Sequence, residues 1–201
     1  MRVVINFLLT LITILAFFSC KKGDTSSSFS ASGVGGNWKF ISISVHTQRT
    51  IQWTYDGSAF RSISNSDYTS TNDSGKVTFT SGAMIETGIS YKAYWNFYTY
   101  DYINNQLTDS LSDPDFANIS QFSSTSFSKL VGLDSLYITG QSLFSTKIGP
   151  FTSASYGAKF TINGSTLMMT SSAVRDTVIN IGNMVTAQHD SLSAVTTLEK
   201  E

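Results

Sequence analysis

Few residues in this chain have the types and spacing that catalysis needs. The two histidines, His46 and His189, are far apart in the sequence, and Cys20 is the only thiol. The chain has neither a His-x-x-x-His pair of metal ligands nor a Gly-x-Ser-x-Gly nucleophile turn. Four carboxylates could supply a general acid and base, but their spacing singles out no pair. They are Glu86, Asp109, Asp113 and Asp115. We therefore expect no enzymatic activity, no cofactor and no metal site.

A second group of candidates lies in the aromatic segment 91–102. Alternate side chains of a strand point to opposite faces, so this segment has two aromatic faces. One carries Tyr91, Ala93, Trp95 and Phe97, and the other carries Tyr94, Tyr98, Tyr100 and Tyr102. We expect the first face to be core, whereas the tyrosine face suits a wet interior, a sugar-stacking platform or a partner surface. The alternative is that aromatic residues simply favour strands. The candidates for ligand binding are Tyr94, Trp95, Phe97 and Tyr98.

The elements that must position these residues are strands. The sequence has abundant Ser, Thr, Tyr and Phe, only two prolines and no long amphipathic helix, which favours an all-β domain. The simplest fold is an antiparallel meander of about eight to ten strands that closes fully or partly into a barrel, because closure removes exposed edges. Two polar or irregular stretches, 58–71 and 114–129, are predicted to be loops with a short helix or helical turn. The strand-like runs are 38–47, 50–55, 76–80, 84–90, 91–103, 106–112, 135–139, 142–148, 154–162, 166–171, 174–181 and 184–198.

Turn residues separate several of these runs. A tight hairpin needs residues with positive φ, which Gly and Asn tolerate. The clearest hairpin signal is Asn163-Gly164 between two apolar runs. The other predicted turns are Asp73-Ser74-Gly75, Asn104-Asn105 and Gly182-Asn183.

The first residues predict export and lipid attachment. Met1-Arg2 is positive, residues 3–18 are almost all apolar, and Ser19 precedes Cys20, which is the pattern of a cleaved signal peptide. Residues 16–20 resemble the acylation site of bacterial lipoproteins, particularly the loose form in Bacteroidota. The resemblance implies a signal peptide over 1–19 and a lipid on Cys20, which holds the protein at a membrane. An N-terminal helix with a buried cysteine is the alternative, but its apolar surface would be exposed on all sides.

The remaining chain is one domain behind a tether. Residues 20–35 are rich in Ser and Gly and predict a flexible spacer. Removal of Arg2 with the signal leaves 12 of the 13 basic residues against 14 acidic ones, so the charge does not favour nucleic-acid binding. No cysteine follows Cys20, so the mature chain cannot form an internal disulfide. Stability must therefore come from a hydrophobic core and strand pairing.

The start and the end of the domain carry a family resemblance. Gly36-Asn37-Trp38 resembles the Gly-x-Trp start of lipocalins and of lipocalin-like domains in Bacteroidota lipoproteins, and residues 157–170 resemble a late hairpin of those domains. The resemblance implies a lipocalin-like barrel over 36–201 in which Trp38 plugs the closed end under an arginine from the last strand. Here the last predicted strand has no arginine, and Arg175 lies one strand earlier. The alternative role for Trp38 is ligand contact.

Four triplets resemble the Asp-(Ser/Thr)-apolar acceptor of O-glycosylation in Bacteroidota, and they should lie at the surface because a glycan is bulky. Their acceptors are Ser110, Ser135, Thr177 and Ser191.

These observations leave three hypotheses for an envelope protein, which we expect at the outer membrane. The first is a lipocalin-like lipoprotein that binds a small apolar or amphipathic ligand. The second is a surface module that binds a glycan or partner protein through exposed tyrosines. The third is an enzyme, and the scarcity of catalytic groups ranks it last.

Lipidation gives a direct test of the N-terminal prediction. We expect cells that express the wild-type chain to incorporate labelled fatty acid into the protein, and the Cys20→Ala variant to incorporate none, because the thiol is the attachment point. Gel fluorography of the two purified proteins measures this. Equal labelling of both would contradict the prediction.

Overall fold

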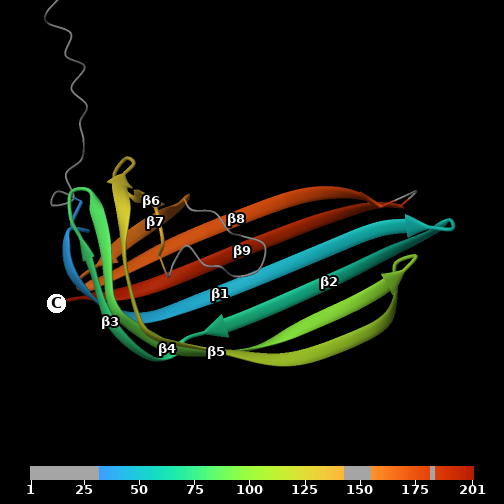
Figure 1. The fold of residues 1–201 in the computed structure, drawn as a ribbon, viewed down its shortest axis with the longest axis horizontal. Coiled ribbons are helices and arrows are strands. Elements are labelled where there is room, and N and C mark those ends of the chain that lie inside the picture. Colours follow the sequence, from blue (N-terminus) through green and yellow to red (C-terminus); the bar gives the residue numbers. More distant parts are fainter. Residues whose placement is uncertain (1–31, 143–154, 182–183) are drawn as a thin grey trace, which may run out of the picture.

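The computed structural model describes residues 32–142, 155–181 and 184–201. In these residues the chain forms nine strands that pair antiparallel (Figure 1), which confirms the all-β prediction. None of the described segments is a helix of the length and hydropathy needed to cross a membrane. The strands are β1 (Gly36–Tyr55), β2 (Ser58–Thr69), β3 (Thr71–Phe79), β4 (Ala83–Ile103), β5 (Gln106–Leu130), β6 (Ser135–Thr139), β7 (Ser155–Asn163), β8 (Thr166–Ile181) and β9 (Met184–Lys200).

The sheet closes into a ring because its last strand pairs with its first. β9 runs along β1 from Lys200 opposite Trp38 to Thr186 opposite Trp53. β2 and β3 share one place in the ring, since β3 pairs with residues 36–39 of β1 and β2 pairs with residues 44–55. β4 passes both, pairing with β3 by its first half and with β2 by its second half. At the end that contains β3, the ring therefore runs β1-β3-β4-β5-β6-β7-β8-β9.

Six strands continue past the short strands β3, β6 and β7. Only residues 127–130 of β5 pair with β6, and only residues 166–171 of β8 pair with β7. Beyond these points β8, β9, β1, β2, β4 and β5 form an open curved sheet, which we call the extension (Figure 1). Its edges are β5 and β8, and no other strand in the described part of the chain pairs with them there. The barrel is thus closed at one end and open along the extension.

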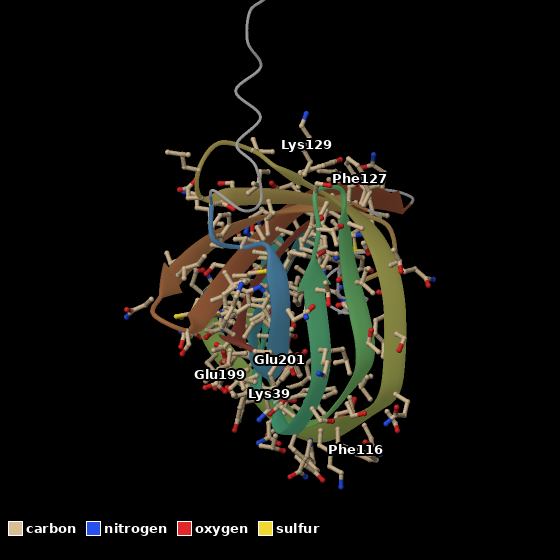
Figure 2. The ribbon with its side chains drawn as sticks, turned by 90° about the vertical axis from the view of Figure 1, so that its left-hand side faces the viewer. Lys39, Phe116, Phe127, Lys129, Glu199 and Glu201 are labelled. Atoms are coloured by element: carbon tan, nitrogen blue, oxygen red, sulfur yellow. The ribbon has the colours of Figure 1, made fainter. Side chains whose placement is uncertain are left out.

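Side chains alternate between an inner face, which is continuous with the interior of the ring, and an outer face. In the ring the inner face is packed: Trp38, Phe40 and Met84 are at most 1% exposed, and such values leave no water-sized space beside these side chains. The alternation is clear in β5, where Ser128 and Leu130 are buried while Phe127 and Lys129 point outward (Figure 2). The closed end of the barrel is therefore filled by its own side chains.

Trp38 lies at this packed end. Its indole Nε1 donates a hydrogen bond of 2.8 Å to the carbonyl of Val34. The ammonium of Lys200, in the last strand, lies 4.4 Å from the Trp38 ring centroid and donates to the carbonyl of Gly35. The residue of the last strand that packs on Trp38 is thus a lysine and not the arginine that the lipocalin resemblance implies, and it lies two residues beyond the predicted end of that strand. Val34 is fully buried, so the packed domain includes the last residues of the predicted tether.

Two regions that we expected to be irregular are strands, so those predictions were wrong. Residues 58–69 form β2, and residues 114–129 lie within β5. β2 is polar because its side chains bond across the sheet; Ser64 Oγ, for example, lies 3.0 Å from Thr99 Oγ1. Residues 114–129 show no apolar pattern in the sequence because 114–116 are exposed on both faces, Gln121, with φ of 54°, interrupts the alternation, and serines take the inner positions 124, 126 and 128. Pairing with neighbouring strands holds both segments in the sheet, and in the second segment Ile119 and Phe122 also pack against the core.

Long strands also absorb several runs that the sequence predicted separately. Runs 38–47 and 50–55 join in β1, runs 84–90 and 91–103 join in β4, and runs 166–171 and 174–181 join in β8. The run at 142–148 lies outside the described residues except for Ser142. These joins make the strands long enough to reach from the ring into the extension.

The predicted turns have different outcomes. Asn104 and Asn105, with φ of 51° and 65°, join β4 to β5 as predicted, and Gly164, with φ of 60°, lies in the predicted hairpin between β7 and β8. Asp73-Ser74-Gly75 is instead a bulge inside β3. Gly75 has φ of 111°, and a Cβ there would lie 2.6 Å from the Cα of Ile89, so the bulge needs glycine. Gly182-Asn183 lies outside the described residues.

The burial of Trp38 gives a stability test. Trp38→Ala should lower the free energy of unfolding by about 3–5 kcal/mol, because it removes a large core side chain and leaves a cavity. Phe127→Ala is the control: its side chain is 55% exposed, and the expected change is about 0.5 kcal/mol or less. Urea unfolding followed by far-UV circular dichroism measures both. A change below about 1 kcal/mol for Trp38→Ala would show that the residue is not core.

Candidate ligand-binding face

The inner face of the extension exposes apolar side chains that the ring does not cover. Phe97 on β4, Leu111 on β5 and Ile179 on β8 are 40%, 64% and 43% exposed. The register places all three on the face that becomes the core in the ring. This face is therefore an exposed continuation of a hydrophobic core, and an exposed apolar patch of this kind marks a candidate interaction site.

Trp95 and Phe97 lie where the ring opens into the extension. Their ring centroids are 6.3 Å apart with an interplanar angle of 87°. Tyr68 on β2 adds a third ring, 5.5 Å from Trp95. Tyr68 and Trp95 pack on the core, so one side of this aromatic group is held rigidly. The sequence placed Trp95 and Phe97 on one face, and the structure brings them together there.

Tyr94 and Tyr98 lie on the opposite, outer face, as the alternation requires. They are 63% and 43% exposed. Tyr94 stacks on Phe116 of β5 at 6.3 Å, and the Asn96 side chain donates to the Tyr98 hydroxyl. The four residues predicted to bind ligand therefore divide into two pairs on opposite faces and do not form one site.

Trp53 and Phe60 form an inner-face pair that the sequence analysis missed. Their rings stack with centroids 5.3 Å apart and an interplanar angle of 7° near the tip of the extension. They are directly opposite in the β1–β2 hairpin, whose turn is Asp56-Gly57 with φ of 49° and 73°. Asp-Gly is a strong hairpin signal, and counting outward from it would have paired these two residues.

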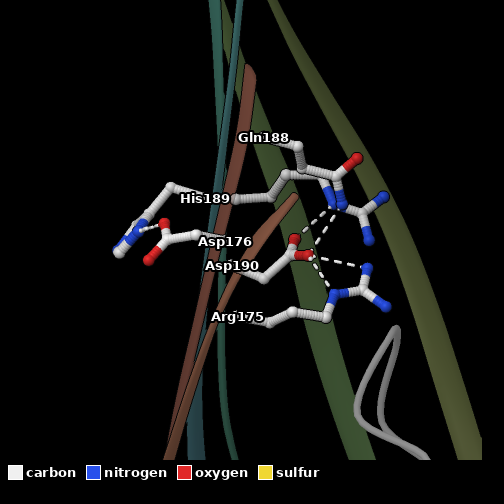
Figure 3. A network of polar contacts seen from close by, with 6 residues as sticks. Arg175, Asp176, Gln188, His189 and Asp190 are labelled. Atoms are coloured by element: carbon white, nitrogen blue, oxygen red, sulfur yellow. Dashed lines mark hydrogen bonds and ion pairs between the residues drawn. The ribbon is translucent and has the colours of Figure 1, made fainter. Parts of the chain in front are cut away.

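A row of charged side chains crosses the inner face between the two aromatic groups. Arg49 on β1, Asp190 on β9 and Arg175 on β8 are directly opposite one another in the register. Arg49 Nε lies 2.7 Å from Asp190 Oδ1, and Arg175 Nη2 lies 2.9 Å from Oδ2. Gln188 donates a further bond of 2.7 Å to the same carboxylate. Figure 3 shows Arg175 and Gln188 converging on Asp190.

The electrostatics of this row follow from its burial. The Asp190 side chain is only 2% exposed, whereas those of Arg49 and Arg175 are 41% and 43% exposed. Burial acts to raise the pKa of Asp190, but the hydrogen bonds from Arg49, Gln188 and Arg175 and the charge of Arg49 outweigh it and lower that pKa below the usual range of an aspartate. Two guanidinium groups thus converge on a single buried carboxylate in this row.

A separate polar cluster is enclosed in the ring. Glu86 is 1% exposed; its carboxylate accepts hydrogen bonds from Ser124 and, at 3.1 Å, from Ser142. Ser142 Oγ lies 3.3 Å from the hydroxyl of Tyr156, and burial raises the pKa of Tyr156. Burial also raises the pKa of Tyr68, whose neighbour is Tyr91. These bonds satisfy the Glu86 carboxylate within the core.

The other predicted acid and base groups are not brought together with Glu86. Three lie on β5 and are exposed, namely Asp109, Asp113 and Asp115. His46 Nδ1 lies 2.6 Å from Asp67, and His189 Nδ1 lies 2.7 Å from Asp176, both on the outer face. Among the described residues no group of three His, Cys, Asp or Glu is placed to hold a metal ion.

The described glycosylation candidates lie on four different strands and do not form a cluster. Of the four glycosylation candidates, Ser110 is exposed on β5, whereas the other three are half-buried. Those three are Ser135, Thr177 and Ser191. Gly36 is exposed at the start of β1, and Cys20 lies outside the described residues.

The comparisons with known proteins identify no family. No protein-family model matches the sequence, and no curated protein matches it either. Ail, the attachment invasion locus protein of Yersinia pestis, is 8% identical with a TM-score of 0.22, over 81% of this chain and 99% of that one. The translocator domain of the autotransporter NalP from Neisseria meningitidis is 7% identical with a TM-score of 0.21, over 79% of this chain and 88% of that one. Likenesses at such TM-scores show nothing about the function of this chain.

The buried carboxylate gives a pH test. A lowered pKa in the folded state means that Asp190 contributes stability above about pH 4 and loses it as the pH falls through the folded-state pKa. Asp190→Asn should lower the free energy of unfolding at pH 7 by about 2–3 kcal/mol, less than for a fully buried pair because the arginines are half exposed. The variant should also be less sensitive to acid than the wild type.

Asp67→Asn is the matched control, since Asp67 is 72% exposed and pairs with His46. Its expected effect is about 0–1 kcal/mol. Urea unfolding at pH 7 and pH 3 measures all three proteins. If both variants lose the same free energy of unfolding at pH 7, the prediction that the buried Asp190 carboxylate stabilises the fold is contradicted.

Proposed function

We propose that this protein is an envelope lipoprotein, anchored through a lipid on Cys20, whose lipocalin-like domain binds a small apolar or amphipathic ligand. The binding site is the inner face of the extension, between Trp95 and Phe97 at the ring and Trp53 and Phe60 at the tip. Residues 20–35 connect this face to the membrane. The scarcity of converging acid, base and nucleophile groups favours binding over catalysis.

The observation that carries this proposal is the change along the inner face. In the ring the face is filled, with Phe40 and Ile43 fully buried on β1. Farther along, Phe97 and Ile179 stay at least 40% exposed on the same face. Exposing these side chains to water is unfavourable by about 25 cal/mol for each Å² of apolar surface. A ligand that covers them recovers this free energy.

A surface module is the second candidate, supported by Tyr94, Tyr98 and Phe116 on the outer face, which are 63%, 43% and 66% exposed. Exposed tyrosine rings can stack on sugars or on partner side chains at low entropic cost. Loss of glycan binding in a Tyr98→Ala, Tyr100→Ala variant would support this function instead.

Tryptophan fluorescence tests ligand binding. Titration with dodecanol and, separately, with laurate should change the emission of the wild-type protein, because Trp95 lies at the mouth of the ring. Trp95→Phe should remove the part of this change that comes from Trp95 and leave the part that comes from Trp53, while the ligand still binds, as measured by equilibrium dialysis. Trp38→Phe is the control, since Trp38 is 1% exposed, and it should leave the response in place. If no twelve-carbon amphiphile binds, whether its headgroup is charged or uncharged, the proposed function is contradicted.

A further inference from the structure

The charged row on the inner face is built in a way that points to a ligand. The Asp190 carboxylate is almost completely buried and holds Arg49 by its Nε alone. Among the described residues, no hydrogen bond is formed by the two terminal amino groups of Arg49, and the side chain is 41% exposed. Those two groups form the planar pair of donors that binds carboxylate and phosphate oxygens in a bidentate manner.

The surroundings of Arg49 are suited to the rest of an amphipathic molecule. On β1, Ile51 and Trp53 follow it on the same face, toward the tip, and Trp53 stacks on Phe60. Successive residues of one face lie about 7 Å apart along a strand, so Trp53 is about 13 Å from Arg49. On the ring side, Phe97 of β4 lies one inner-face position nearer the ring than Arg49, directly opposite Ser66 of β2. A charged centre thus has apolar surface on both sides.

The acidic residues of the same face restrict where an anion can lie. Asp101 on β4 and Asp109 on β5 are directly opposite each other. They lie one inner-face position nearer the tip than Arg49, and β2 separates them from the strand that carries Arg49. Asp113 and Asp115 lie on the inner face of β5, opposite Phe97 and Trp95. The β4–β5 side therefore repels anions, while Arg49 and Arg175 attract them to the β1, β9 and β8 side.

We propose that Arg49, oriented by the buried Asp190 and supported by Arg175, binds the anionic headgroup of an amphipathic ligand, a carboxylate or phosphate on an apolar tail. This inference rests on the proposed function and specifies the chemical class of its ligand. Asp190 is the positioning residue: it fixes the guanidinium of Arg49 before the ligand arrives, so little entropy is lost on binding. The tail covers the exposed aromatic side chains, and the headgroup contacts the positive row.

Four ligands with the same twelve-carbon tail separate the headgroup from the tail. They are laurate, dodecyl phosphate, dodecanol and dodecyltrimethylammonium. We expect laurate or dodecyl phosphate to bind at least about tenfold more tightly than dodecanol, which corresponds to about 1.4 kcal/mol, and the cation to bind most weakly. The preference between laurate and dodecyl phosphate shows which oxygen acid the site takes.

Variants identify the residue responsible. Arg49→Gln should weaken the binding of the preferred anion about tenfold or more and leave the affinity for dodecanol within about twofold of the wild-type value. The affinity of Arg49→Lys for the anion should lie between those of the wild type and Arg49→Gln, because lysine keeps the charge but loses the planar donors. Arg61→Gln is the matched control: Arg61 lies on the outer face of the extension, 4.5 Å over the Tyr102 ring, and its loss should leave both affinities unchanged.

Salt provides a measurement on the wild-type protein that does not depend on how the variants fold. Raising the ionic strength should weaken the binding of the anion and leave the affinity for dodecanol unchanged. Three results would overturn this inference while the proposed function stands. They are equal binding of all four ligands, tighter binding of the cation, and an equal loss of affinity for laurate and for dodecanol in Arg49→Gln. Binding of none of the four ligands would overturn both.

Discussion

The pairing of β9 with β1 joins the two ends of the domain along most of their length. It begins with Lys200 opposite Trp38, where the ammonium covers the indole, and ends with Thr186 opposite Trp53 near the tip. Without this ladder, β1 and β9 would be two open edges of a long sheet, which is a liability for aggregation. The same ladder brings Arg49 opposite Asp190. Closure of the barrel and assembly of the charged row therefore depend on one set of backbone hydrogen bonds.

The unequal lengths of the strands explain why one end is packed and the other is open. β6 has 5 residues and β7 has 9, whereas β4 has 21 and β5 has 25. Where all eight places of the ring are occupied, inner-face side chains meet one another and exclude water. Where the short strands end, the same faces of β4 and β8 have nothing opposite them among the described residues. A continuous inner face thus changes from core to candidate binding surface along single strands.

Asp190 lies at this transition, next to Leu192, which is 6% exposed in the core. A buried carboxylate is costly unless charged donors satisfy it, and Arg49, Arg175 and Gln188 do so. The arrangement fixes two long side chains that would otherwise be mobile on an exposed sheet. It also places the partly exposed guanidinium of Arg49 between two apolar surfaces, which is a poor arrangement for a core and a useful one for an amphipathic ligand.

The sequence by itself determined the strand class, the alternation of faces at Trp95 and Tyr94, and the hairpins at Asn104-Asn105 and Gly164, because these depend on neighbours within a few residues. It also predicted Trp38 as core. It did not predict that 58–69 and 114–129 are strands, since their polar side chains are stabilised by partners on other strands. Only the tertiary structure decided that Arg49, Asp190 and Arg175 form one row, because residues 49 and 190 are distant in the chain and meet only through the register of β1 with β9. The same holds for the open inner face, which results from where β6 and β7 end and not from any pattern within β4 or β8.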